Sequence, residues 1–378
     1  MDKESINRRQ FLRLAGITAA GLGLAACAPA AAPTPTPTKA AATSAPAANA
    51  PAASPTPSEA EAAARLYEAA KKEGQVMAYS VGTITQLEAI AAAFEKKYPG
   101  IKASSFTGTN EAIVDKLLTE ARAQKPIGDL IVKINFSDIY ALSKEGVLDQ
   151  YLSPELKNFD KQSYDPQGLY TIVDNIVELI EYNTKAIPKE QAPKSYQDLL
   201  KPEFKGKLGL EASAVPWFTG MLRIMGKEKG LEYMKKLAEQ KPRLVSGHTT
   251  LHKLVVSGEI PVAVYMHQFN PVTDKAAGMP IEWVDPEEVT PTQPLVTTLA
   301  KKSPHPNAAR LLTDFLLSEE GAKILVSQGW LPARKGVDLG KGLAEVAKVE
   351  SLLLNDVAFG KEVADNDKLF RDIFGKAN

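Results

Sequence analysis

Short apolar segments alternate with amphipathic segments early in the chain, and this alternation constrains the fold more than any other feature. Segments 76–79, 101–106 and 129–134 read as short strands, and 129–134 is mostly apolar. Between them, apolar residues recur every three or four positions over 87–98 and 113–121, as in helices that bury one face. Strand, helix, strand, helix and strand in this order predict a doubly wound parallel sheet.

A second alternating unit follows in the middle of the chain, and the end of the chain is helical. We expect further strands at 171–182, 207–211 and 261–266, and further helices at 230–239, 249–257, 309–317 and 318–326.

The first residues are typical of an export signal. Arg8 and Arg9 precede a short apolar stretch, residues 14–26, which is typical of a signal peptide and short for a membrane span. The arginine pair and the residues after it are similar to a twin-arginine motif. Leu24-Ala-Ala-Cys27 is similar to a bacterial lipobox, in which cleavage leaves the cysteine as a lipidated first residue. We therefore expect residues 1–27 to be a lipoprotein signal peptide, with Cys27 as the lipidation site.

Residues 28–58 consist almost entirely of Ala, Pro, Thr and Ser. Such a segment cannot bury enough apolar surface to offset its ordering entropy, so we expect a disordered, semi-stiff tether. Function must then lie in residues 59–378. Because Cys27 is the only cysteine, a disulfide within the chain and a multi-cysteine zinc site are both excluded.

Charge and motifs argue against several functional classes. Lys and Arg total 45 and Asp and Glu total 45, so the formal net charge is zero, which does not favour a nucleic-acid partner. The chain lacks G-x-S-x-G, H-E-x-x-H and a Walker-type loop, so we expect no enzyme and no cofactor. A hydrolase, an adhesive lipoprotein and a ligand-presenting sensor lipoprotein remain as alternatives.

Several phrases, in the same order along the chain, resemble those of bacterial ABC-importer solute-binding lipoproteins. The resemblance covers nearly all of residues 65–375 and is nearest to the iron(III)-type subgroup with type II periplasmic-binding-protein architecture. The phrases are LEAIAAAFEKKYPG at 87–100, LSKEGVL at 142–148, IEYNTK at 180–185, SYQDLLKPEFKGK at 195–207, DFLLSEEG at 314–321 and GWLP at 329–332.

The resemblance implies an α/β fold with two lobes joined by two crossing strands that act as a hinge. It places the crossings near 175–183 and 285–299, lobe one at 59–178 plus 295–378, and lobe two at 179–294. It also implies a monomer, anchored at the outer face of the cytoplasmic membrane, that captures a small ligand by hinge closure and delivers it to an ABC permease.

Iron-binding members of this subgroup hold Fe(III) with one His, one Glu and two adjacent Tyr. By resemblance, those positions fall at Thr83, at Ile134 or Asn135, and at Gln268-Phe269, so all four ligands are absent. We expect no metal held in that way. A shifted ferric site with non-standard ligands (Tyr265, His267 and His248) stays open.

Loops that follow the strands of a doubly wound sheet face the ligand crevice. Residues 213–217 also resemble the family's anion-cradling loop, and helix N-termini attract anions, so we expect a small organic anion or a polar metabolite. Trp217 could equally be core, and His248 and His267 could be ordinary surface residues, as we expect for His252 and His305. The ligand-binding candidates are Ser80, Thr83, Thr107, Thr109, Asn110 and Asn135 in lobe one, and Ser213, Trp217, His248, Thr249, His267 and Gln268 in lobe two.

Overall fold

The computed structural model describes residues 58–81, 84–355 and 357–375, all within one compact unit. Helices and strands alternate along most of it. The helices are α2 (Glu59–Glu73), α3 (Ile84–Lys97), α4 (Asn110–Arg122), α5 (Phe136–Lys144), α6 (Val215–Met225), α7 (Lys227–Glu239), α8 (His248–Ser257), α9 (Phe269–Ala276), α10 (Pro306–Leu317), α11 (Glu319–Ser327), α12 (Gly340–Val346) and α13 (Val357–Phe374). The strands are β1 (Gln75–Ser80), β2 (Lys102–Thr107), β3 (Leu130–Asn135), β4 (Leu148–Asp149), β5 (Thr171–Asn183), β6 (Leu208–Glu211), β7 (Arg243–Val245), β8 (Val262–His267), β9 (Ile281–Val284), β10 (Thr290–Ala300), β11 (Leu331–Pro332) and β12 (Ser351–Leu353).

The strands lie in the order β2-β1-β3-β10-β5-β8-β6-β7. We call the part around β1, β2, β3 and β10 sheet A, and the part around β6, β7 and β8 sheet B. Strands β1, β2 and β3 are parallel, and so are β6, β7 and β8. Each parallel set meets an antiparallel strand, β10 in sheet A and β5 in sheet B.

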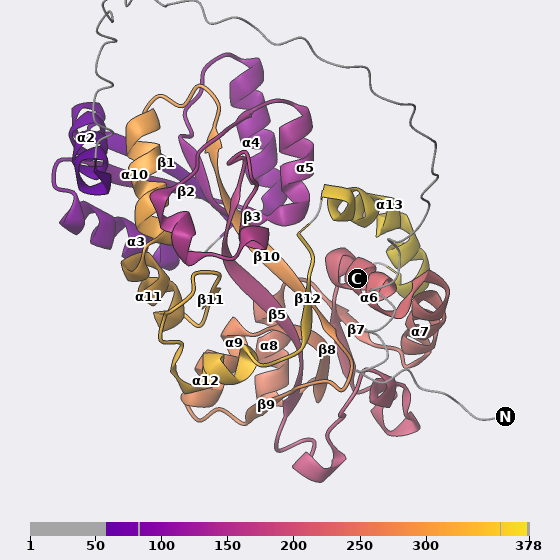
Figure 1. Ribbon diagram of the computed structural model, residues 1–378. Coiled ribbons are helices and arrows are strands. Elements are labelled where there is room, and N and C mark those ends of the chain that lie inside the picture. Colours follow the sequence, from indigo (N-terminus) through magenta and orange to yellow (C-terminus); the bar gives the residue numbers. More distant parts are fainter. Residues whose placement is uncertain (1–57, 82–83, 356, 376–378) are drawn as a thin grey trace, which may run out of the picture. The chain divides into compact units, whose positions relative to one another are not determined.

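The two long strands β5 and β10 run side by side and connect the sheets (Figure 1). The first part of β5 pairs with β10, whereas its second part pairs with β8 and β9. All but one of the thirteen residues of β5 are buried, because helices and loops cover both faces. The chain therefore crosses between the sheets through continuous, buried strands.

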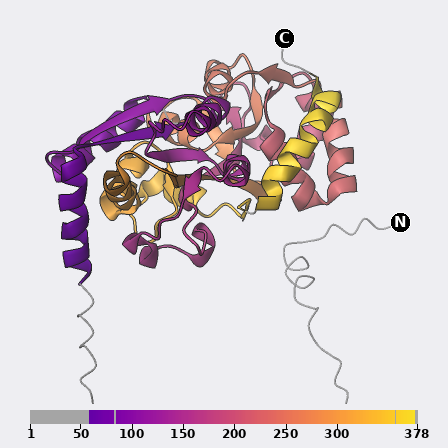
Figure 2. The same cartoon turned by 90° about the horizontal axis from the view of Figure 1, so that it is seen from above.

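Each sheet has its own apolar core. Helices α3 and α10 cover one face of sheet A, where Phe94 contacts Phe315, and α4 and α5 cover the other face (Figure 1). In sheet B, Trp217 and Phe218 of α6 form the centre of a core that also includes α7. Helix α13 joins that core through Phe370 and lies beside α6 and α7 (Figures 1 and 2).

Most predicted segments correspond to elements of the structure, within a few residues at each end. Several helices were not predicted, among them α6 and α13. Helix α6 is almost wholly buried, so its sequence lacks the polar face that reveals a helix. Helix α13 lies beyond the last segment that we assigned. The Oγ of Ser195 accepts from the Asp198 N–H at 3.1 Å, beside a short 3-10 turn, Gln197–Leu200.

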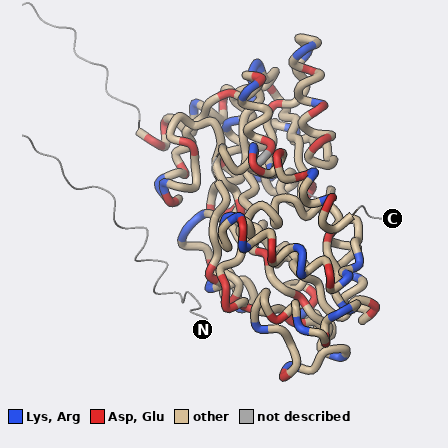
Figure 3. Tube along the Cα trace, turned by 90° about the vertical axis from the view of Figure 1, so that its right-hand side faces the viewer, with Lys and Arg blue, Asp and Glu red and all other residues tan. Residues whose placement is uncertain are grey.

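Acidic and basic residues are interspersed over the described chain (Figure 3). This distribution agrees with the balanced composition. Among the described helices, none is both long enough and apolar enough to cross a membrane.

Candidate ligand site where the two sheets meet

The carboxyl ends of the parallel strands in both sheets converge on the middle of β5. Asn135, which ends β3, is paired with Leu295 of β10, and Leu295 is paired with Asp174 of β5. His267, which ends β8, is paired with Glu178 of β5. Asp174 and Glu178 are separated by about 13 Å along an extended strand. Ligands of open α/β sheets bind outside the carboxyl ends of the strands, so this stretch is where a ligand would contact both sheets.

The sheet A candidates lie together at this edge. Ser80 is buried at the end of β1, and Thr107 is half-buried at the end of β2. Thr109 caps α4, because its Oγ1 accepts from a first-turn N–H at 3.3 Å. The Oδ1 atom of Asn110 accepts from the Asn135 N–H at 3.2 Å. This bond joins the starts of α4 and α5.

Two histidines are in contact at the sheet B edge. The rings of His248 and His267 are stacked, with centroids 3.6 Å apart and planes inclined by 30°. The Tyr265 ring is 5.2 Å from the His248 ring. Nδ1 of His248 and Nε2 of His267 are buried and have no hydrogen-bond partner in the described part of the chain. Buried polar atoms are normally paired, so these two nitrogens indicate a missing partner.

Burial keeps both imidazoles neutral at neutral pH. It lowers the pKa of His248 to about 4, although the nearby Glu211 carboxylate opposes the change. Burial also lowers the pKa of His267 well below 6.5, and the neighbouring His248 adds to this. A neutral imidazole offers one donor and one acceptor. The pair can therefore contact a polar ligand without supplying charge.

The loops before α6 and α8 are held by a carboxylate of the protein itself. Glu211 ends β6, and its Oε2 accepts from the Ser213 N–H at 2.7 Å and from the Ser213 Oγ at 2.8 Å. Its Oε1 accepts from the Gly247 N–H at 3.1 Å. Gly247 has a φ of 87°, a conformation that favours glycine, and α8 begins at the next residue. Donors that we expected to cradle an anion at Ser213 thus bind Glu211 instead.

Trp217 and Thr249 are placed differently from the histidines. Trp217 is 0% exposed and stacks on Tyr265, with centroids 5.1 Å apart, so it belongs to the core behind the site. Thr249 is exposed and is the second residue of α8, whose N-cap is Gly247.

Gln268 connects the site to the crossing strand. Its side-chain oxygen accepts from the Val177 N–H at 2.9 Å, and its side-chain nitrogen donates to the Asn175 carbonyl at 3.1 Å. It is fully buried. These contacts indicate that Gln268 fixes the start of α9 on β5.

Glu178 is a candidate that the sequence analysis missed. It is 0% exposed on β5, directly opposite His267, and directly opposed residues of an antiparallel pair project from the same face. Its Oε1 accepts from the Gln293 amide, and its Oε2 has no partner among the described residues. The available signal was that Glu178 is one of three carboxylates within the β-prone run 171–182.

The positions that resemble iron ligands have other roles. Ile134 lies in the core, and Phe269 stacks on Trp330 with centroids 4.4 Å apart. No group of three or more His, Cys, Asp or Glu suited to a metal ion occurs among the described residues. The structure does bring His248, His267 and Tyr265 into ring contact.

The expectation that His252 and His305 lie in solvent is wrong. His252 is 4% exposed and contacts Glu181 at 2.7 Å and Asp274 at 2.9 Å. His305 contacts the buried Asp129. In both cases a carboxylate from a distant element draws the imidazole inside.

Two of the proposed functional residues cannot be placed. Thr83 and Cys27 lie outside the described residues, as do the expected signal peptide and most of the expected tether.

The convergence of two α/β sheets on shared crossing strands defines a two-lobed binding protein of the type II class. Residues 126–352 match the family described as bacterial extracellular solute-binding proteins, and the chain belongs to this family. A relative over 275 residues is an uncharacterized protein of Haemophilus influenzae, 22% identical, with 69% of this chain and 78% of that protein aligned.

Solved structures share the fold at low sequence identity. The periplasmic binding protein AfuA from Actinobacillus pleuropneumoniae, bound to exogenous fructose-6-phosphate, is 22% identical with a TM-score of 0.70, over 80% of this chain and 98% of that chain. Iron-bound HitA from Pseudomonas aeruginosa is 22% identical with a TM-score of 0.68, over 79% of this chain and 99% of that chain. The predicted fold class is confirmed, and the protein is an extracytoplasmic solute-binding component of the ABC-importer class.

Proposed function

We propose that this protein is an exported, lipid-anchored solute-binding protein. It captures a small polar metabolite between the ends of β3 and β8 and delivers it to an ABC permease. One observation carries the placement of the site: two stacked, neutral imidazoles, His248 and His267, have buried nitrogens without partners in the described chain. A bound solute would supply the missing partner.

Hinge motion on β5 and β10 would close the site. Both strands pass between the sheets, and Gln268 and Glu178 lie where the sheet pairing of β5 changes from β10 to β8. Small backbone changes in that stretch would move the His267 edge relative to the Asn135 edge. Such closure around a ligand is a common way for two lobes to trap a solute.

The anchor and the solute are separate parts of the proposal. Cys27 is the lipidation site in it, and several acyl chains at one residue would hold the folded part at a membrane. Cys27→Ser should move the protein from the membrane fraction to the soluble fraction, whereas Ser58→Ala should leave it in the membrane fraction. If the Cys27→Ser variant stays in the membrane fraction, the proposed lipid anchor is wrong and the proposed solute site is unaffected.

The binding site is tested by a thermal-shift screen on the full chain in detergent, stripped of carried-over ligand by unfolding and refolding. The panel contains sugar phosphates, carboxylates, phosphonates, amino acids, amines and sugars. A ligand at about 100 times its Kd adds ~2.7 kcal/mol, which is several degrees in Tm. The double variant His248→Asn, His267→Asn should lose that shift, and Thr249→Ala should keep it. A shift that survives in the double variant would place the site elsewhere.

A metal is the second candidate, because ring contacts group His248, His267 and Tyr265. Imidazole nitrogens suit transition metals, and a phenolate suits Fe(III). Ferric and zinc salts therefore belong in the screen. A metal-dependent shift that a chelator reverses and Tyr265→Phe abolishes would favour this candidate over an organic solute.

A further inference from the structure

Glu178 places a buried carboxyl group midway between the two apolar cores. Side chains of a strand alternate between faces, so Ile176, Glu178 and Ile180 share one face of β5. Ile176 packs in the core of sheet A and Ile180 packs in the core of sheet B. A carboxyl group between two apolar cores is costly to bury without a partner.

The partners of Glu178 differ from those of the other buried carboxyl groups. In the described chain, the other carboxyls that are 5% exposed or less each contact a basic side chain or backbone N–H groups. Asp129 contacts His305, Asp174 contacts Lys133, Glu181 contacts His252, and Glu211 contacts the N–H groups of Ser213 and Gly247. Glu178 contacts only the side-chain amide of Gln293, and its Oε2 has no partner within the described residues. One oxygen of the Glu178 carboxyl group is therefore left to accept a hydrogen bond from a bound molecule.

The surroundings of Glu178 suit an ammonium group. His267 lies directly opposite on the same face, with its Nε2 unpaired among the described residues. The Tyr196 and Tyr265 side chains are close enough for a charge on Glu178 to raise the pKa of both phenols. Carboxylate oxygens and a neutral imidazole nitrogen accept hydrogen bonds, and aromatic rings attract cations.

We infer that the solute carries a primary ammonium group, which donates hydrogen bonds to the Glu178 carboxylate and to His267. This inference rests on the proposed solute-binding function and names the chemical class of its ligand. A sugar or a simple organic anion would leave the Glu178 carboxyl without a cation.

Ammonium binding should release a proton. Burial raises the pKa of Glu178 well above its usual value, and the Gln293 hydrogen bond offsets this only in part, so burial favours the protonated form of the unliganded carboxyl group. The ammonium ion favours the carboxylate, and the carboxyl proton leaves to solvent. The titratable groups facing Glu178 are His267, Tyr265 and Tyr196, and His248 lies behind His267. These four are neutral at neutral pH, since their pKa shifts are away from the charged form.

The test uses matched pairs of small solutes on the full, ligand-stripped chain. The pairs are 4-aminobutanoate with 4-hydroxybutanoate, and 1,4-diaminobutane with 1,4-butanediol. We expect an amine to bind and its hydroxyl counterpart to bind at least tenfold more weakly. Glu178→Gln should weaken amine binding by roughly tenfold to a hundredfold, the range for a hydrogen bond to a charged group. Glu181→Gln is the matched control, because Glu181 is buried on the same strand but contacts His252.

Calorimetry in two buffers of different ionisation enthalpy counts the protons. The wild-type chain and Glu181→Gln should each release about one proton per amine bound, and Glu178→Gln should release none. A structural role for Glu178 would not produce this difference.

The outcomes separate this inference from the proposed function. Equal binding of amines and hydroxyl counterparts, or unchanged amine binding and proton release in Glu178→Gln, would overturn the inference. If solutes of the function screen bind but none of them is an amine, the inference is overturned and the proposed function stands. If no solute of either panel binds, both fail.

Discussion

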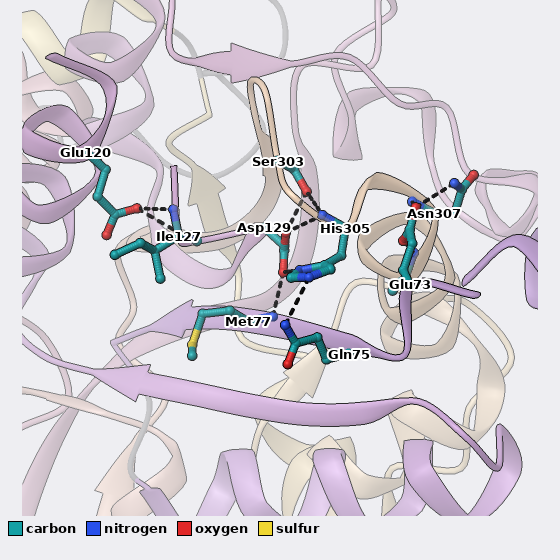
Figure 4. Close-up of polar contacts among 11 residues, drawn as sticks. Glu73, Gln75, Met77, Glu120, Ile127, Asp129, Ser303, His305 and Asn307 are labelled. Carbon is teal, nitrogen blue, oxygen red and sulfur yellow. Dashed lines mark hydrogen bonds and ion pairs between the residues drawn. The ribbon is translucent and has the colours of Figure 1, made fainter. Parts of the chain in front are cut away.

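Two buried polar regions of this protein differ in whether their hydrogen bonds are complete. At the amino end of sheet A, Asp129 accepts from the Met77 N–H, the Ser303 Oγ, the His305 N–H and the His305 Nδ1, all at 2.7–2.9 Å (Figure 4). At the carboxyl end of sheet B, Glu178, His248 and His267 each have a buried atom without a partner in the described chain.

Two further carboxylates in this part of the protein, Glu120 and Glu73, also have both of their oxygens hydrogen-bonded. Glu120 accepts from the Tyr79 hydroxyl and from the N–H groups of Ile127 and Gly128. Glu73 accepts from the Asn307 side chain and from the Ala308 N–H, at the start of α10 (Figure 4). These carboxylates fix the ends of strands and helices to one another.

The comparison separates polar groups that stabilise the fold from polar groups that a solute would pair in the proposed function. A buried carboxylate with all of its acceptor sites used strengthens the native state, whereas an unpaired one weakens it. In the proposed function, a bound solute supplies the missing partner.

Asp129→Ala should lower the free energy of unfolding by about 3 kcal/mol or more. The change leaves four donors without their charged acceptor in a site that is 0% exposed, and such losses are costly. Urea denaturation of the folded unit measures it. Ligand-induced shifts in the remaining folded protein should be those of the wild-type chain, because Asp129 lies at the opposite strand ends from the site. A loss below about 1 kcal/mol would show that the network adds little.

The pH dependence of stability should differ between His248 and His252. Burial lowers the pKa of His248 from 6.5 to about 4, so the folded state binds fewer protons than the unfolded state between these values. The stability from this group is complete above about pH 6.5 and falls as the pH drops towards about 4, by about 3 kcal/mol in total. His248→Asn should flatten this decline.

His252 should behave in the opposite way. Burial lowers its pKa, but the contacts with Glu181 and Asp274 outweigh burial and raise it. Its contribution is therefore present below the unfolded value of 6.5 and is lost as the pH rises through its raised pKa. His252→Asn should destabilise the protein more at acidic than at alkaline pH. Chemical denaturation across the pH range measures both variants, and slopes of equal sign would contradict the assignment.

Matched amide substitutions should separate the two regions at neutral pH. Glu120→Gln removes a charged acceptor from the Tyr79 hydroxyl, from Lys116 and from two N–H groups, so it should cost about 1–3 kcal/mol. Burial favours the protonated form of the Glu178 carboxyl group, so Glu178→Gln, which introduces an amide of similar shape, should change the unliganded stability by less than about 1 kcal/mol. Thermal and urea denaturation of the two variants together give the comparison. Equal losses would mean that Glu178 is a stabilising residue of the fold.

Much of the fold could be predicted from the sequence, because apolar residues recur with different periods in strands and in helices. Apolar spacing placed α3, α4, β1, β2 and β3 within a few residues of their observed bounds. Helix α6 was not predicted, because it is buried on all sides and its apolar residues therefore show no helical period. Its first-turn proline, Pro216, was an available signal.

The site was less readable, because it depends on pairing between distant strands. Loop position nominated His248 and His267 as ligand-binding residues, and the structure brings their rings into contact at the edge of sheet B. Glu178 becomes a site residue only through its register with His267, and Ser213 loses its donors to Glu211 only in the folded chain. Partner assignments of this kind cannot be derived from spacing in one sequence.

Arg243→Ala should have the smallest effect and helps to limit the site. In the structure the Arg243 guanidinium contacts Glu259, with both side chains more than half exposed, and exposed ion pairs contribute about 0.2–1 kcal/mol at most. Arg243 begins β7, whereas the ligand edge lies at the carboxyl ends of β6 and β8. Its removal should therefore leave Tm within about 2 °C and ligand affinity unchanged. A tenfold loss of affinity in Arg243→Ala would extend the site along β7. Ligand contacts would then also come from a solvent-exposed, ion-paired residue, and not only from buried groups that lack hydrogen-bond partners.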